Sequence, residues 1–354
     1  DLARRDFTIN AVAWHPLREV LHDPYGGADD LKERRLRTVG DPAERFSEDY
    51  LRVLRALRFA GAFRLRVEGA TWRALAGAVD RLGHLSPERI REEMEKVLGF
   101  DTGARPSACL SLYAASGALQ RLYPELDAVV GARDDDRPGD AWSHVLRTVD
   151  RLSPRDPERR WIALLSRVAP APSHGEGKGE AGEDPRHGRI LAAATLLERL
   201  RSSNARIDRV AGAVGWVSPP PAPTLDEKEL RRWLSALGRE RLADLLAVWA
   251  AEVRSDEGRM ERSNGEGEGG GWDRDGFLSL FRRTRQMARS PLPLTVDELA
   301  LSGRDLIRMG YRPGPRFGEV LRHLLDLVLE DPTRNDPEIL SEEARRWMEA
   351  GDES

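Results

Sequence analysis

Residues 48–59 read EDYLRVLRALRF, and an arginine stands at every third position of this stretch from residue 52 onward. Three residues advance an α-helix by about 300°, so each arginine falls about 60° behind the previous one. The charged side chains therefore form one slanting polar band on a predicted helix: Asp49, Arg52, Arg55 and Arg58. Apolar side chains fill the other side, which predicts a face buried in a core: Leu51, Val53, Leu54 and Leu57.

Three arginines on one band repel one another unless anions lie beside them. A ligand that carries several phosphates would supply such anions, and Asp49 would then hold a carboxylate at the edge of the ligand site. The alternative is a solvated helix face whose charges form ion pairs at i,i+3 spacing. Both interpretations stay open at this point.

The composition excludes several classes of protein. The 354 residues carry a net charge of −4, so no overall basic field indicates nucleic acid, although local patches could still bind it. The single cysteine, Cys109, excludes an internal disulfide and a cysteine-based zinc cluster, and it fits a reducing cytoplasm. No apolar run approaches the roughly 20 residues of a membrane-spanning helix.

The sequence predicts a mainly α fold, α+β overall, in which a few strands lie near the start and helices form the rest. Length alone favours two to four domains. Composition divides the chain into four blocks: 1–63, 64–130, 141–217 and 225–354.

Two kinds of local signal refine this division. In the first block, DPYGG (23–27) predicts a turn. In the second, SPERIREEMEKVL (86–98) predicts a helix that has Ser86 as its N-cap and Pro87 at its first position. Two stretches rich in glycine, glutamate and serine, 170–187 and 254–272, are predicted to be mobile surface loops.

Six motifs follow one another in a fixed order along the chain: RRDFTINAVA (4–13), DPYGGADDLKERRLRTVGDPAERF (23–46), EDYLRVLRALRF (48–59), SPERIREEMEKVL (86–98), LRSSNARIDRVAGAV (200–214) and LALSGRDLIRMGYRPGPRFGEVLRHLLDLVLEDPTRN (299–335). In wording and order they resemble the bacterial class II tRNA nucleotidyltransferase and poly(A) polymerase family, which includes the CCA-adding enzymes. The resemblance implies a nucleotidyltransferase head, then a helical neck, a helical body and a tRNA-binding tail in the four blocks above.

The resemblance also implies an activity, the addition of CCA to the tRNA 3′ end from CTP and ATP, with Mg²⁺ as the metal. Such an enzyme selects a base without a nucleic-acid template, and a carboxylate beside a guanidinium offers the acceptor and the donors of a base edge. By resemblance, Asp49 and Arg52 read the base, Arg55 and Arg58 lie toward the triphosphate, and Arg5 also contacts the nucleotide. A poly(A) polymerase of the same family and a non-catalytic helical RNA-binding protein remain alternatives.

Other polar residues near the start have simpler interpretations. Arg4, Arg5 and Asp6 could form a structural ion-pair cluster, and Asn10 is expected to be structural. Asp23 is expected to cap a turn rather than to bind a metal. The family places its metal-binding Asp-x-Asp pair before RRDFTINA, so the resemblance implies that these carboxylates precede Asp1. We therefore expect residues 1–354 alone to bind nucleotide weakly and to catalyse nothing.

The body and the tail raise two further questions. Some relatives carry a His-Asp phosphohydrolase domain in the body, and His144 matches its first histidine. The His-Asp doublet is replaced by Ser166-Arg167, and His187 has no partner at ligand spacing, so no metal site is expected here. In the tail, Arg312 and Arg316 flank a Gly- and Pro-rich turn that could bind a tRNA phosphate or simply join two helices.

Overall fold

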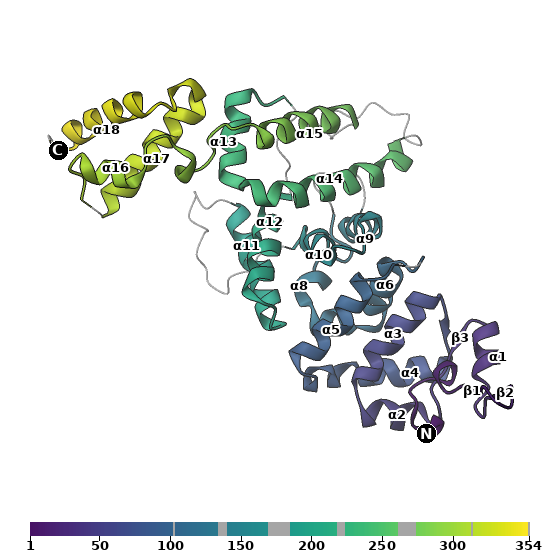
Figure 1. Ribbon diagram of the computed structural model, residues 1–354. Coiled ribbons are helices and arrows are strands. Elements are labelled where there is room, and N and C mark those ends of the chain that lie inside the picture. Colours follow the sequence, from purple (N-terminus) through teal and green to yellow (C-terminus); the bar gives the residue numbers. More distant parts are fainter. Residues whose placement is uncertain are drawn as a thin grey trace. The chain divides into compact units, whose positions relative to one another are not determined.

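The computed structural model describes residues 1–101, 103–133, 140–168, 185–217, 224–260, 274–312 and 314–352. Helices dominate these ranges, and the few strands lie near the N-terminus (Figure 1). The predicted mainly α fold with few strands is confirmed. The chain forms two compact units, Asp1–Pro219 with Ala247–Gly269, and Pro220–Leu246 with Gly270–Ser354. The finer division into four blocks stays a prediction.

The first unit begins with short elements and continues with helices. Its strands are β1 (Ala13–His15), β2 (Val20–His22), β3 (Arg35–Leu36) and β4 (Arg66–Val67). Its helices up to residue 127 are α1 (Gly27–Lys32), α2 (Pro42–Glu48), α3 (Leu51–Phe63), α4 (Gly69–Ala78), α5 (Pro87–Leu98), α6 (Pro106–Ser116), α7 (Ala118–Leu122) and α8 (Pro124–Asp127). Four more follow: α9 (Ala141–Arg151), α10 (Pro157–Leu165), α11 (Pro185–Arg199) and α12 (Asn204–Val217).

The strands form two small sheets. β1 pairs with β2 in antiparallel orientation, so that Trp14 lies opposite Leu21, and β3 pairs with β4 in parallel orientation. Asp23 lies in the turn after β2, and its carboxylate accepts hydrogen bonds from the backbone N–H of Gly27 and of Ala28, both at 2.8 Å. These hydrogen bonds, the one from Ala28 above all, lower the pKa of Asp23. The predicted capping role of Asp23 is confirmed.

Helix α3 packs its apolar face into the core, as its sequence pattern predicted. Val53, Leu54 and Leu57 are fully buried. At the far end of the helix, a Cβ atom on Gly61 would lie 2.3 Å from Sγ of Cys109 on α6, so only glycine allows this close approach of the two helices. Cys109 is a buried free thiol.

The boundary of α3 differs from the predicted one. We expected one helix to include Asp49 and the three arginines, but α2 ends at Glu48 and α3 begins at Leu51. Asp49 lies between the two helices in an extended conformation, with φ −157° and ψ 108°. The single continuous helix over 48–59 is therefore wrong, while the apolar face of the segment is right.

The predicted start of α5 and the two predicted surface loops can be compared with the structure. Helix α5 starts as expected, because the Ser86 side chain accepts the backbone N–H of Arg89 and Pro87 occupies the first turn. Most of the two predicted surface loops, 170–184 and 261–272, lies outside the described residues. Their edges are helical, in α11 and at the end of α14 (Arg239–Met260), so the loop prediction is wrong for 185–187 and 254–260.

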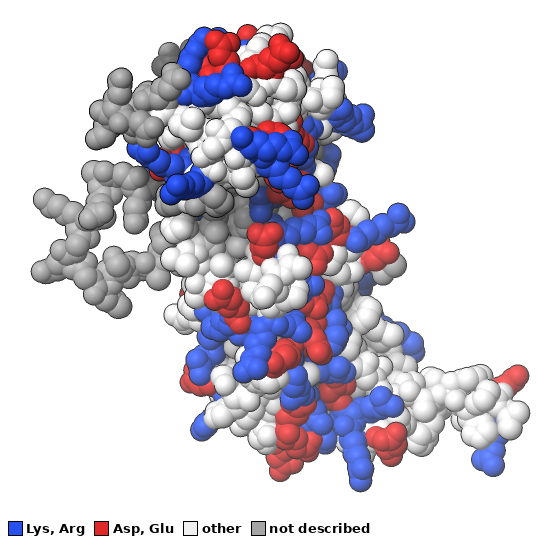
Figure 2. All heavy atoms as spheres, turned by 60° about the vertical axis from the view of Figure 1, so that its left-hand side comes forward, with Lys and Arg blue, Asp and Glu red and all other residues white. Residues whose placement is uncertain are grey.

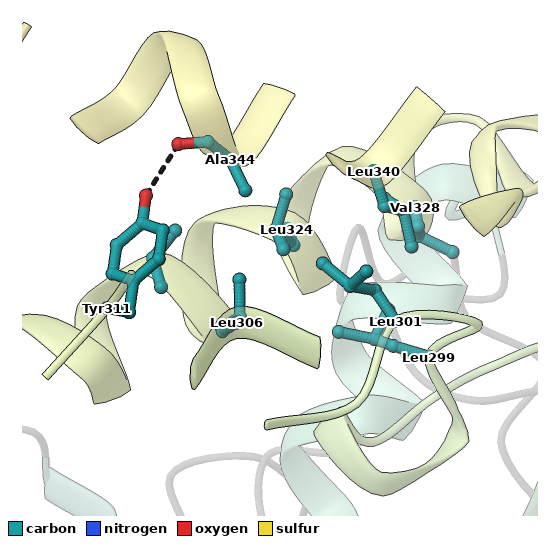
Figure 3. Close-up of a cluster of buried hydrophobic side chains, with 9 residues drawn as sticks. Leu299, Leu301, Leu306, Tyr311, Leu324, Val328, Leu340 and Ala344 are labelled. Atoms are coloured by element: carbon teal, nitrogen blue, oxygen red, sulfur yellow. Dashed lines mark hydrogen bonds between the residues drawn. The ribbon is translucent and has the colours of Figure 1, made fainter. Parts of the chain in front are cut away.

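The second unit has its own core. Its further helices are α13 (Glu227–Leu237), α15 (Arg274–Arg289), α16 (Gly303–Arg308), α17 (Pro315–Glu330) and α18 (Pro337–Asp352). Buried leucines from α16, α17 and α18 meet there, and the Tyr311 hydroxyl donates to the backbone carbonyl of Ala344 (Figure 3). The buried Arg231 guanidinium of α13 donates to the carbonyls of Leu329 and Glu330 at the end of α17. Within the described ranges, no helix has both the length and the apolar character needed to cross a bilayer.

The buried face of α3 gives the first prediction. Leu54→Ala should lower the free energy of unfolding by about 2 to 5 kcal/mol, because it removes buried methyl groups and leaves a cavity. Leu17→Ala is the matched control, since the Leu17 side chain is 91% exposed and should leave stability unchanged. Denaturant unfolding of both variants measures the difference, and equal stability of the two would contradict the packing of α3.

Candidate nucleotide-binding site

Each arginine of α3 already has a carboxylate partner within the protein. Arg52 donates to the Glu48 carboxylate and, at 2.8 Å, to the backbone carbonyl of Arg45. Glu48 also pairs with the Arg45 guanidinium at 3.1 Å, so two guanidinium groups share one carboxylate. The hydrogen bond from Arg52 is the main reason why the pKa of Glu48 is lowered.

The next two arginines reach carboxylates on other segments. Arg55 donates from Nε and Nη2 to Oδ2 of Asp6, each at 2.7 Å. The other oxygen of Asp6 accepts the Phe7 backbone N–H and the Asn10 amide, which gives Asn10 the structural role expected of it. Arg58 donates to Oε2 of Glu93 at 2.7 Å, and Lys96 pairs with the second oxygen of Glu93.

Asp49 is paired with a residue of α5 rather than with Arg52. Its Oδ1 accepts the backbone N–H of Leu51 at 3.0 Å, and its Oδ2 accepts Nη2 of Arg89 at 2.8 Å. Burial works against ionisation of this carboxyl, but the hydrogen bonds from Arg89 and Leu51 outweigh it and lower the pKa of Asp49. Asp49 is therefore ionised at neutral pH and presents a carboxylate acceptor at the start of α3.

These carboxylate partners explain how three arginines can lie close together on α3 without a bound ligand. The expected alternative of ion pairs on the surface is correct in part, since every arginine of the band is paired. Only the Arg52–Glu48 pair has the spacing of neighbouring helical turns, however, and the pairs of Arg55 and Arg58 join segments 49 and 35 residues apart. The guanidinium carbons of Arg55 and Arg58 also lie 5.3 and 4.5 Å from the centroid of the Phe59 ring, where a cation is favourable.

Arg5 differs from these arginines. Its side chain is exposed, and it forms no ion pair with any residue that the structure describes. Arg4 also lacks an ion pair within those ranges, so the predicted cluster of Arg4, Arg5 and Asp6 is not formed, and Asp6 pairs with Arg55 instead. The role of Arg5 in nucleotide binding stays a prediction.

The body contains a buried cluster of polar and charged side chains at the positions compared above with a His-Asp motif. Nε2 of His144 lies 3.5 Å from Oε1 of Glu252, and Nη2 of Arg167 lies 3.6 Å from the same oxygen. Ser166 donates its hydroxyl to the backbone carbonyl of Ala163. His187 is exposed near the start of α11. Across the described ranges, no three His, Cys, Asp or Glu side chains come together as a metal-ligand set.

The two arginines predicted for RNA binding lie near the start of α17. Arg312 and Arg316 are both exposed there. Basic and acidic side chains are interspersed over the face of the molecule in Figure 2, without one continuous basic stripe. This pattern agrees with the net charge of −4, and the side chains visible in this view mark no RNA path on this face.

Comparisons with known proteins identify relatives along most of the chain. The family model of the poly A polymerase head domain matches residues 1–37, and a model described as the probable RNA and SrmB-binding site of polymerase A matches residues 64–130. An A-adding tRNA nucleotidyltransferase of Deinococcus radiodurans is 31% identical over 342 residues, which cover 92% of this chain and 74% of that protein. A multifunctional CCA protein of Xanthomonas campestris is 32% identical, over 91% of this chain and 75% of that protein.

The chain belongs to the tRNA nucleotidyltransferase family. A solved structure of the Bacillus stearothermophilus CCA-adding enzyme in complex with CTP has a TM-score of 0.62 and 26% identity, and the match covers 100% of this chain and 75% of that one. Sequence reasoning missed three partners of the candidate site residues, namely Glu48, Arg89 and Glu93. A signal was present in SPERIREEMEKVL, where Arg89 and Glu93 lie at i,i+4 spacing on one helix face.

The body of this tRNA nucleotidyltransferase gives the second prediction. Residues 141–217 should add no metal-stimulated phosphohydrolase activity, because Ser166 and Arg167 replace the two ligands that such a site needs. Hydrolysis of 2′,3′-cyclic phosphates with and without added divalent metal, in the wild type and in His144→Ala, measures it. Metal-dependent hydrolysis that His144→Ala abolishes would contradict the prediction.

Proposed function

We propose that this tRNA nucleotidyltransferase adds CCA to the tRNA 3′ end from CTP and ATP. In each step the 3′ hydroxyl of the tRNA forms a new bond to the α-phosphorus, the bond between the α-phosphorus and the bridging oxygen breaks, and pyrophosphate leaves. The observation that carries the proposal is the half-buried Asp49 carboxylate at the start of α3, three residues before Arg52. Together they offer an acceptor and a fork of donors for a base edge.

The remaining arginines suit the phosphates of the nucleotide. Arg55 and Arg58 follow Arg52 along α3, and each guanidinium carries donors beyond those used on its carboxylate partner. Arg5 is exposed, which leaves its charge available to a phosphate. A bound triphosphate would place negative charge beside these guanidinium groups and accept charge-assisted hydrogen bonds from them.

The proposal extends to partners, metal and compartment. We infer that tRNA is the acceptor and that exposed arginines of the tail, including Arg312 and Arg316, contact its backbone. The family chemistry implies Mg²⁺, but the described residues do not offer a ligand set that fits it. The buried free thiol of Cys109 fits a cytoplasmic protein.

The third prediction tests the activity with single nucleotides. The full-length gene product, given tRNA that lacks its 3′ CCA, should incorporate CMP from CTP and then AMP from ATP. Incorporation of AMP alone, onto tRNA that already ends in CC, would favour the A-adding activity named for the Deinococcus radiodurans relative. Long tails from ATP on unrelated RNA, with CTP ignored, would favour a poly(A) polymerase.

The fourth prediction separates base reading from phosphate binding in the same protein. Arg52→Ala should reduce discrimination between bases, by about 1 to 3 kcal/mol if the contact resembles other bidentate base readings. Arg58→Ala should weaken CTP and ATP by the same factor, because a phosphate contact carries no information about the base. Steady-state incorporation with each of the four nucleotides measures both. Full selectivity of Arg52→Ala would contradict its assignment to the base.

A further inference from the structure

Three exposed arginines meet where the parallel strands β3 and β4 begin. The backbone N–H of Arg66 donates to the carbonyl of Arg34 at 2.7 Å, and Arg35 lies opposite Arg66 in the register of the two strands. Arg64 stands two residues before Arg66, directly after the end of α3. The side chains of Arg34, Arg64 and Arg66 are all exposed, and we call these three residues the β3–β4 patch.

The β3–β4 patch lacks the carboxylate partners that balance the arginines of α3. None of its three arginines forms an ion pair with a residue that the structure describes. The carboxylates closest in sequence are engaged elsewhere, because Glu33 pairs with Arg35 at 2.9 Å and Glu68 accepts the backbone N–H and the hydroxyl of Thr71, both at 2.9 Å. Like charges that lie close together without a counter-ion repel one another, so the patch attracts an anion from outside the chain.

Two of these arginines occupy backbone conformations that favour glycine. The angle φ is 53° at Arg34 and 54° at Arg64, in the left-handed region where a side chain costs free energy. Arg64 is also the left-handed residue that ends α3, a position at which glycine is the usual residue. Arginine at both positions is unfavourable for the fold itself, so a contact of the side chains with a ligand accounts for it better than stability does.

An exposed aromatic ring borders the patch. Phe63 is 57% exposed, and its ring stacks on that of Phe59 with 6.0 Å between the centroids and 14° between the planes. Much of the Phe63 ring therefore remains available to a further planar or apolar group, such as a ribose or a base. Guanidinium groups beside an exposed aromatic ring are typical of surfaces that bind RNA.

We infer that the β3–β4 patch and Phe63 form a docking surface for the sugar–phosphate backbone of RNA, separate from the candidate nucleotide-binding site. The arginines contact phosphate oxygens, and Phe63 packs against a ribose or a base. The 13 residues of α3 span about 20 Å, so this surface lies at the opposite end of the helix from Asp49 and takes no part in the choice of nucleotide. The inference rests on the proposed function in one respect, namely that the RNA is tRNA.

The test measures the affinity of the full-length gene product for tRNA that lacks its 3′ CCA at several salt concentrations. In a triple variant that combines Arg34→Gly, Arg64→Gly and Arg66→Thr, the slope of log K against log[salt] should become shallower by about 2 to 3, because three phosphate contacts no longer release counter-ions. Lysine at the same three positions keeps the charges and should keep most of the slope. KM for CTP and ATP at saturating tRNA should stay at wild-type values in both variants.

Thermal stability separates an RNA contact from a structural role. Glycine suits the left-handed conformations of Arg34 and Arg64, so the triple variant should keep the wild-type thermal midpoint while it loses affinity for tRNA. The matched control is Arg201→Gly, since Arg201 is also exposed and left-handed, with φ 51°, but pairs with Glu88 at 3.5 Å. This control should leave both the affinity and the salt slope unchanged.

Phe63→Ala adds a readout that does not depend on charge. It should weaken the binding of tRNA roughly tenfold and keep the wild-type salt slope, because packing of the ring on RNA releases no counter-ion. Wild-type affinity of this variant would contradict the part of the inference that concerns Phe63.

The outcomes distinguish this inference from the proposed function. Wild-type affinity and slope in the triple variant, or an equal loss in Arg201→Gly, would overturn the docking surface while incorporation of CMP and AMP by the wild type still supports the proposed function. A triple variant that keeps its affinity for tRNA but changes the sedimentation of the protein alone would assign the surface to a contact between copies of the chain, against this inference. A wild-type enzyme that neither binds tRNA nor incorporates CMP or AMP would overturn the proposed function, and the inference with it.

Discussion

The guanidinium groups along α3 must each be balanced by an anion, and the surrounding elements are arranged to supply one. The carboxylates come from three separate segments, because Glu48 ends α2, Glu93 lies on α5 and Asp6 lies in the RRDFTINA motif. Charges held close together in a partly buried setting interact strongly, so an unbalanced arginine would be costly. The charge of one helix thus fixes the positions of three other segments around it.

The same arrangement joins the two ends of the first block of sequence. Asp6 accepts from Arg55, from Asn10 and from its neighbour's backbone, so the RRDFTINA motif is attached to α3 by its acidic residue. The same motif also contacts α1. A Cβ atom on Gly27 would lie 2.0 Å from the backbone carbonyl oxygen of Thr8, so α1 packs closely on the motif. Motifs that are distant in sequence are therefore close in space because of specific polar contacts.

Much of this could be predicted from the sequence wherever the controlling interaction is local. The apolar face of α3 follows from periodicity, and the caps at Ser86 and Asp23 depend on residues within five positions. The sequence pattern predicted a helix that includes Asp49, because Asp49 continues the three-residue spacing of the arginines. The backbone at Asp49 is extended instead, and α3 starts after it. The partners Glu93 and Arg89 were missed because they lie 35 and 40 residues from the groups that they bind. The i,i+4 spacing of Arg89 and Glu93 marks one charged helix face, but it does not specify which distant groups that face contacts.

Burial decides which of these pairs a ligand can alter. Glu48 is 49% exposed, so a base that binds Arg52 as proposed would displace it at a small cost in solvation. Glu93 is 1% exposed and the Arg58 side chain is 13% exposed, so separating them would leave a charge buried and unpaired. If Arg58 binds phosphate as proposed, it must do so while it remains on Glu93, as a fixed cation. On the proposed function, the end of the band that reads the base could exchange the partner of Arg52, whereas the end that binds phosphate would keep the Arg58–Glu93 pair for both nucleotides.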